Sequence, residues 1–139
     1  MNATTTALLA YIGWTLALII AIELGRTYMV VVKGYPATQF KPDGADISPF
    51  MSRMCRAHAN CVENFPIFGG LLILALVTGQ AKITDPLALY YLGARLAQSI
   101  AHISSGGAIA TNIRFVFFAV QLAIGGVLFF RFLAIGIAG

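Results

Sequence analysis

Long apolar runs along the chain alternate with short polar segments. Apolar residues dominate positions 6–32, 58–79, 86–104 and 115–137. Each run is close to the roughly 20 residues that an α-helix needs to cross the hydrocarbon core of a bilayer. The pattern therefore predicts an all-α integral membrane protein, a bundle of about four transmembrane helices. We expect residues 1–139 to form a single domain.

Turn-forming and capping residues set the expected ends of these helices. Prolines and an Asp-Gly pair fill residues 34–49, which we interpret as a mobile cytoplasmic loop. The second helix should begin at Ser48-Pro49, because serine caps a helix and proline suits its first position. Pro66 within that helix predicts a kink. The other expected boundaries are Thr78-Gly79 for the end of the second helix, Asp85-Pro86 and residues 104–107 for the third, and Thr111-Asn112 and Gly136 for the fourth.

The scarcity of charge supports a membrane location and suggests an orientation. Only 10% of the residues are charged and 59% are hydrophobic, whereas about a quarter of a soluble domain is charged. Lys and Arg gather on the cytoplasmic side of membrane proteins. Here Lys33, Lys41, Arg53 and Arg56 lie around the first loop and Arg114 near the third, against Lys82 in the second loop. Both termini should therefore face away from the cytoplasm, and we expect membrane lipid, not nucleic acid, as a partner.

Polar side chains recur at helical spacing inside the second and third apolar runs. Arg53, Arg56, Asn60 and Glu63 lie at i, i+3, i+7 and i+10, which places them on one face of a helix. A second stripe consists of Tyr91, Arg95, Gln98 and His102, and a third begins with Arg114, Phe118 and Gln121. Charges inside a membrane are costly and are usually paired. We therefore predict that the first two stripes meet each other or line a shared wet pocket. We also predict an ion pair between Glu63 and Arg95, which either takes part in ligand binding or only holds the two helices together.

Such a pocket would be strongly cationic. Arg53, Arg56, Arg95 and Arg114, with Arg26 from the first helix, surround a single carboxylate. Arginine binds carboxylates bidentately, so the expected ligand carries more than one carboxylate and a group that suits Glu63. Glutathione, with two carboxylates, an ammonium, two amides and a thiol, fits this chemistry, and a phospholipid headgroup fits part of it. Arg26 alternatively forms only a local i,i+3 pair with Glu23.

Some side chains favour a structural interpretation. Cys55 and Cys61 are separated by about 9 Å of helical rise, too far for a disulfide, and should be small apolar residues. Tyr11 and Trp14 are placed as interfacial aromatic rings near the far side of the membrane. The glycines Gly69, Gly70, Gly93, Gly125 and Gly126 should permit close helix packing. We find no metal-ligand spacing and expect no metal.

The sequence around the first polar stripe resembles the helix-two signature of the MAPEG family, the membrane-associated proteins in eicosanoid and glutathione metabolism. The resemblance is carried by the run from Arg53 to Pro66, with its Arg-x-x-x-Asn-x-x-Glu core at positions 56, 60 and 63. Further support comes from Tyr90-Tyr91-Leu-Gly-Ala-Arg95, followed by Gln98 and His102, and from Asn112-Ile113-Arg114. The pattern is similar to that of bacterial members, for which the membrane would be the inner membrane.

The resemblance implies a homotrimer of four-helix protomers that binds glutathione between neighbouring subunits near the cytoplasmic face. Arg114 matches the arginine that faces the thiol and is the candidate catalytic residue. Together with the polar stripes, the resemblance gives Arg26, Arg53, Arg56, Asn60, Glu63, Arg95, Gln98 and His102 as glutathione-binding candidates. We expect a glutathione transferase of the microsomal type, with glutathione-dependent peroxidase activity as an additional option. Its second substrate, a lipophilic electrophile or a lipid hydroperoxide, would approach along Phe115 and Phe118.

The sequence also departs from the family pattern. Gln98 and His102 stand where well-known members have tyrosine or histidine, and Phe115 and Phe118 stand where some have hydroxyl side chains. Glutathione binding should survive, because glutamine and histidine still donate hydrogen bonds, but thiol activation would depend on Arg114. Two alternatives stay open: a small four-helix transporter or channel subunit, and a catalytically silent lipid-binding member of the same fold.

Overall fold

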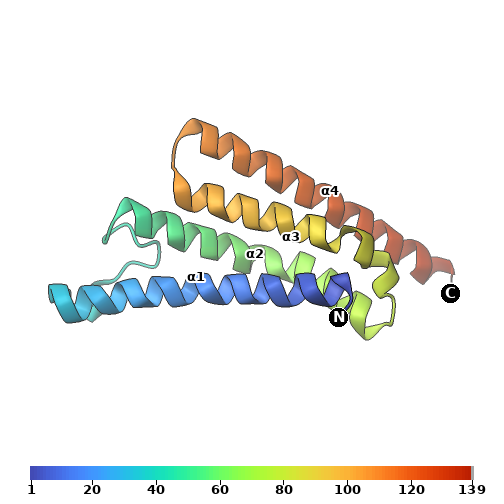
Figure 1. The fold of residues 1–139 in the computed structure, drawn as a ribbon, viewed down its shortest axis with the longest axis horizontal. Helices are drawn as coiled ribbons and strands as arrows, with labels where there is room; N and C mark the ends of the chain where they lie inside the picture. Colours follow the sequence, from blue (N-terminus) through green and yellow to red (C-terminus); the bar gives the residue numbers. More distant parts are fainter. Residues whose placement is uncertain (139) are drawn as a thin grey trace.

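The computed structural model describes residues 1–138, which form four long helices. They are α1 (Ala3–Lys33), α2 (Pro49–Val77), α3 (Ala81–Ser104) and α4 (Ala108–Ala138), with a short 3₁₀ helix η1 (Ala37–Gln39) between the first two. The helices run up and down in sequence order, so the α1–α2 and α3–α4 connections lie at one end and the two termini at the other (Figure 1). This arrangement places the first and third loops on the same side, as the orientation argument requires.

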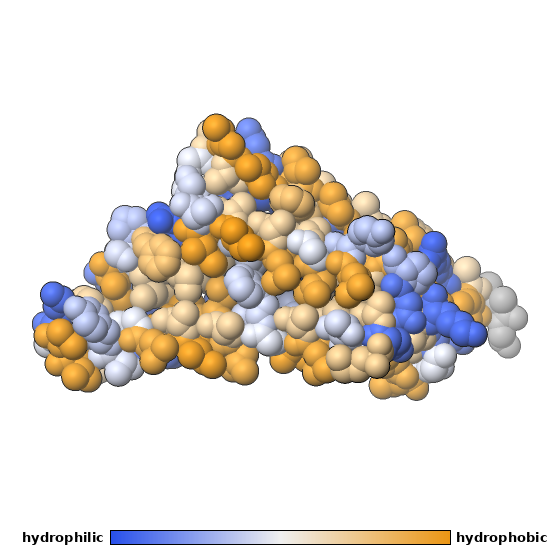
Figure 2. Space-filling model, in the orientation of Figure 1, coloured by the Kyte–Doolittle hydropathy of each residue, from blue (hydrophilic) through white to orange (hydrophobic). Residues whose placement is uncertain are grey.

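The outer surface of the bundle is apolar over most of its length. Within the described residues, α1, α2 and α4 are long and apolar enough to cross a membrane. Figure 2 shows hydrophobic side chains covering α1, with hydrophilic residues gathered mainly toward the two ends of the bundle. In water this surface would be a large exposed apolar area, whereas in lipid it is favourable. The protein is therefore an all-α integral membrane protein, and α3 as a further span stays a prediction.

The helix ends follow local capping chemistry in part. Ser48 accepts a hydrogen bond from the Met51 backbone N–H (3.0 Å), and Pro49 occupies the first turn, so the predicted start of α2 is confirmed. The predicted start of α3 is wrong, because this helix begins at Ala81 and contains Pro86. Pro86 is the sixth residue of α3, beyond its first turn, and the helix continues through it at the cost of one intrahelical hydrogen bond. Helix α4 likewise begins at Ala108, ahead of the predicted position.

Tyr11 lies in the centre of the bundle, which corrects its prediction as an interfacial ring. The side chain is wholly buried, and its hydroxyl donates a hydrogen bond to the Cys61 carbonyl at 2.7 Å. Its ring lies 6.0 Å from that of Tyr91, which in turn stacks on Phe68 at 4.5 Å. An aromatic row thus connects α1, α3 and α2. Both cysteines are free and buried, as predicted.

The first loop folds back onto the bundle, while its mobility stays a prediction. The Tyr35 hydroxyl and the Lys41 backbone N–H both donate to Asp46, at 2.8 and 3.2 Å. Desolvation opposes ionisation of Asp46, but these hydrogen bonds outweigh it and lower the pKa of its carboxyl group below the ordinary value. Gly44 has a φ of +67°, and a Cβ there would lie 2.8 Å from the Met51 side chain. Glycine therefore permits both the turn and the close approach to α2.

Candidate functional site

Two charged side chains of the α2 stripe face outward from the protomer. The side chains of Arg56 and Glu63 are 66% and 58% exposed, and the nearest atoms of the two groups are 4.0 Å apart. Glu63 lies well inside a helix that is apolar enough to cross a membrane. Charges at such a position are stable only beside a protein partner or a wet cavity. This face of α2 is therefore the candidate site in the protomer.

The predicted Glu63–Arg95 ion pair is wrong. Arg95 instead donates a hydrogen bond from Nη1 to Oδ1 of Asn60, while the ion pair of Glu63 is the long contact to Arg56. Three residues of α-helix turn the side-chain direction by about 300°, so Glu63 lies about 60° around the helix from Asn60. That rotation points Asn60 toward α3 and Glu63 away from the bundle.

The polar stripes nevertheless meet, as predicted. Besides the Asn60–Arg95 contact, Arg53 Nε donates to the Ile103 carbonyl at 2.9 Å, which ties the beginning of α2 to the end of α3. On the other side of α3, the amide nitrogen of Gln121 donates to Oε1 of Gln98 at 3.0 Å. Three polar contacts thus connect α2, α3 and α4 through the buried faces of the helices. The sequence located Gln121 on a stripe, but only the packing identifies Gln98 as its partner.

Positive charge gathers at the end of the bundle where α3 passes to α4. His102 is buried in the last turn of α3, where Arg53 reaches the Ile103 carbonyl from α2. The half-buried Arg114 donates from Nη2 to the Thr111 hydroxyl at 2.8 Å. No other hydrogen bond of the Arg114 side chain is present within residues 1–138, so most of its donors are free for a ligand.

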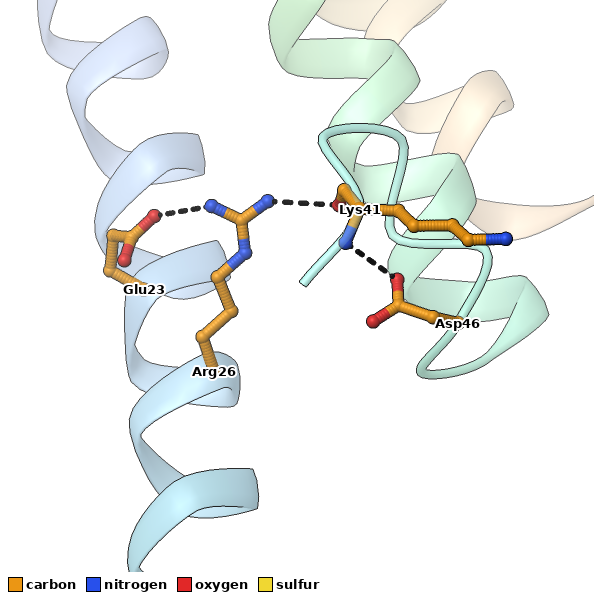
Figure 3. Close-up of polar contacts among 4 residues, drawn as sticks. All are labelled: Glu23, Arg26, Lys41 and Asp46. Atoms are coloured by element: carbon orange, nitrogen blue, oxygen red, sulfur yellow. Dashed lines mark hydrogen bonds and ion pairs between the residues drawn. The ribbon is translucent and has the colours of Figure 1, made fainter. Parts of the chain in front are cut away.

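Arg26 is on α1, which packs against a different face of α2 from the one that carries this cluster. It forms an ion pair with Glu23 at 2.8 Å and donates to the Lys41 carbonyl at 3.4 Å (Figure 3). The local i,i+3 pair is thereby confirmed. A cavity of about 330 Å³ beside it is lined by Ile19, Ile22, Arg26, Phe40, Pro42, Cys55, His58 and Ala59. Within one protomer, the structure does not bring Arg26 to the α2 stripe.

The glutathione-binding candidates differ in accessibility. Three of them, Arg95, Gln98 and His102, are buried inside the protomer. Arg53, Asn60 and Arg114 are partly exposed, and Arg56 and Glu63 are exposed. On α4, Phe115 is 71% exposed and Phe118 is half-buried, next to Arg114 along the helix. The surface available to a ligand is therefore formed by α2 and the beginning of α4, with α3 supporting it from inside.

Comparison with known proteins identifies the family of this chain. The MAPEG family model matches residues 4–134, which include both polar stripes and Arg114. No curated protein and no solved structure matches the chain significantly. The matched segment covers nearly the whole sequence, and it agrees with the all-α membrane fold. The chain is therefore a membrane protein of the MAPEG family, the membrane-associated proteins in eicosanoid and glutathione metabolism.

Proposed function

We propose that this protein is a membrane-bound glutathione transferase that uses Arg114 to stabilise the glutathione thiolate. One observation carries the proposal: Arg56 and Glu63 present a cation and a carboxylate on the exposed side of α2, and the half-buried amide of Asn60 lies between them along the helix. The MAPEG family, to which the chain belongs, includes glutathione transferases. Glutathione is the co-substrate, and no metal takes part.

The exposed Arg56–Glu63 pair suits the binding of a zwitterionic ligand. At 4.0 Å and with both groups largely exposed, this ion pair contributes little stability, so separating the two charges costs little. A ligand with a carboxylate and an ammonium at one end can replace the long contact with two shorter ones, the carboxylate on Arg56 and the ammonium on Glu63. The γ-glutamyl end of glutathione has both groups on one carbon atom.

The outward position of these residues favours a site between protomers. A neighbouring subunit that covers this face of α2 would remove the two charges from lipid and enclose the ligand. We therefore propose a homotrimer with glutathione at each subunit interface. In that assembly, Arg26 contributes only from a neighbouring protomer, because within its own protomer α1 places it against another face of α2. We place the site on the cytoplasmic side, with both termini on the opposite side.

The proposed chemistry depends on the charge of Arg114. A thiol with a pKa of about 8.5 is mostly protonated at pH 7, and the thiolate is the attacking form. The guanidinium group favours the thiolate by charge and by hydrogen bonding, and it is never deprotonated itself. The thiolate then forms a carbon–sulfur bond with the electrophile, whose leaving group departs with the electron pair. Phe115 and Phe118 provide apolar surface beside Arg114 for a substrate that arrives from the bilayer, and neither supplies a hydroxyl donor.

The test is glutathione binding to the detergent-purified protein, with the ultraviolet absorbance of the thiolate as the readout. We expect the wild type to bind glutathione and to form the thiolate at pH 7. Arg114→Ala should still bind but lose most of the thiolate: if Arg114 lowers the thiol pKa by two units, the thiolate-to-thiol ratio falls about a hundredfold, which corresponds to about 2.7 kcal/mol. Arg114→Lys, which keeps the charge but not the planar fork, should be intermediate.

The outcomes separate the proposed function from its alternatives. Full thiolate formation by Arg114→Ala would remove the catalytic role of Arg114 while leaving a glutathione enzyme. Absence of wild-type binding at millimolar glutathione would contradict the transferase. A catalytically silent lipid-binding member would then be favoured, because an apolar groove of about 510 Å³ between α1 and α2, lined by Ile12, Thr15, Leu16, Ile19, Val62, Phe65 and Pro66, suits an acyl chain.

A further inference from the structure

A fully buried cation at the centre of the bundle lacks a carboxylate partner. Arg95 on α3 has no exposed surface, and no salt bridge to it is present within residues 1–138. Its guanidinium carbon lies 5.6 Å from the centre of the Tyr11 ring, and its Nε and Nη2 atoms have no hydrogen-bond partner. A buried arginine is costly to maintain. The role of Arg95 therefore depends on its one directed polar contact, the hydrogen bond from Nη1 to Oδ1 of Asn60.

The chemistry of arginine decides which way the Asn60 amide points. A guanidinium group has only donors, so the atom of Asn60 that faces Arg95 must be the carbonyl oxygen Oδ1. The amide nitrogen Nδ2 must then point away from Arg95. Asn60 is half-buried, and among the described residues its side chain makes one hydrogen bond, the one that Oδ1 accepts from Arg95. Arg95 thus leaves Asn60 with two free N–H donors on the face of α2 that carries Arg56 and Glu63.

We propose that Arg95 is a positioning residue that holds Asn60 with its NH₂ group toward the ligand site. This inference rests on the proposed function and changes the role of Arg95 from a direct glutathione contact to support from behind. It also defines what Asn60 recognises. With Oδ1 turned toward the buried Arg95, the part of Asn60 on the ligand side is its NH₂ group, which binds a hydrogen-bond acceptor such as a carboxylate or amide carbonyl oxygen.

A double-mutant cycle on the dissociation constant of glutathione distinguishes two roles of Arg95. Arg95 either orients Asn60 for the ligand or only holds α2 and α3 together. The full-length protein is compared with Arg95→Met, Asn60→Ala and the double variant, all measured by isothermal titration calorimetry. We expect each single variant to bind about tenfold more weakly, the effect of one lost oriented hydrogen bond. The double variant should bind no more weakly than Asn60→Ala, because Arg95 acts through Asn60. An Arg95→Met effect of equal size in both backgrounds would overturn the inference.

Two further variants keep the test decisive if Arg95→Met fails to fold. Arg95→Lys retains a donor for Asn60 and should restore binding to within a few-fold of wild type. The Asp side chain of Asn60→Asp pairs with Arg95 but has no N–H donor. The melting temperature of this variant should therefore equal that of the wild type, while its glutathione affinity falls about tenfold or more. Wild-type affinity in Asn60→Asp would overturn the inference alone. Absence of binding by the wild type would overturn the proposed function and the inference together.

Discussion

Asp85 shows how one side chain can connect two distant parts of this chain. Its Oδ1 atom accepts hydrogen bonds from the backbone N–H and the hydroxyl of Thr4, at 2.9 and 2.6 Å, and the Thr4 hydroxyl lies 2.6 Å from that of Thr84. The first turn of α1 contains no acidic residue of its own. A carboxylate from α3 therefore satisfies free donors at the positive end of α1. The sequence predicted for Asp85 only a place at the start of the third helix, next to Pro86.

Asp85→Ala should lower the free energy of unfolding by about 1–2 kcal/mol, because it removes both acceptor bonds at the start of α1. Asp85→Asn keeps a carbonyl oxygen in place and should cost less. Chemical denaturation in detergent micelles measures both values. Equal stability of Asp85→Ala and wild type would show that the contact does not contribute to α1 docking.

At the scale of the helices, glycine matters only where a neighbour is close. A Cβ on Gly125 of α4 would lie 2.6 Å from a ring carbon of Phe68 on α2, and that ring is held by stacking on Tyr91. A Cβ on Gly126 would meet nothing within 4 Å. The prediction of close packing is therefore confirmed for Gly125, while Gly126 faces open space in the protomer.

This neighbouring pair provides a matched comparison. Gly125→Ala should lower the free energy of unfolding by about 1–3 kcal/mol, because Phe68 has to move from its stacked position. Gly126→Ala should be neutral or slightly stabilising in the protomer, since alanine is the better helix former. Thermal unfolding in the same detergent compares them. If Gly125→Ala and Gly126→Ala had the same melting temperature, the assigned contact between α2 and α4 would be contradicted.

At the scale of the whole molecule, the exposed charges of α2 indicate that one chain is incomplete by itself. Arg56 and Glu63 are exposed on a helix that is otherwise apolar enough for the bilayer. An amphipathic ligand alone would still leave this face against lipid. A second copy of the chain satisfies the requirement and, with the family, leads to the proposed trimer.

Native mass spectrometry of the protein in mild detergent should therefore show three chains. Chemical cross-linking in intact membranes should likewise give products of at most three chains. A loop variant, Gln39→Ala, changes an exposed residue of η1 and should leave the assembly unchanged. A protein that is entirely monomeric in both experiments would contradict the interface site, and glutathione would then have to bind within one protomer.

Local chemistry was sufficient to predict much of this molecule. The membrane class, the order of the helices and the capped start of α2 at Ser48 depend on hydropathy and on neighbouring residues, and all are readable along the chain. The spacing of Arg53, Asn60 and Arg95 also predicted correctly that the stripes of α2 and α3 meet. The resemblance that identified the family rests on the same local motifs.

Only the tertiary structure decided which members of each stripe are partners. One residue along a helix rotates the side chain by about 100°, so a small change in helix rotation exchanges one partner for another. That is why Asn60 and not Glu63 contacts Arg95, and why Tyr11 lies in the core instead of at the interface. The contact of Asp85 with Thr4 and the fold of the first loop onto α2 likewise depend on helix packing, which no local pattern specifies.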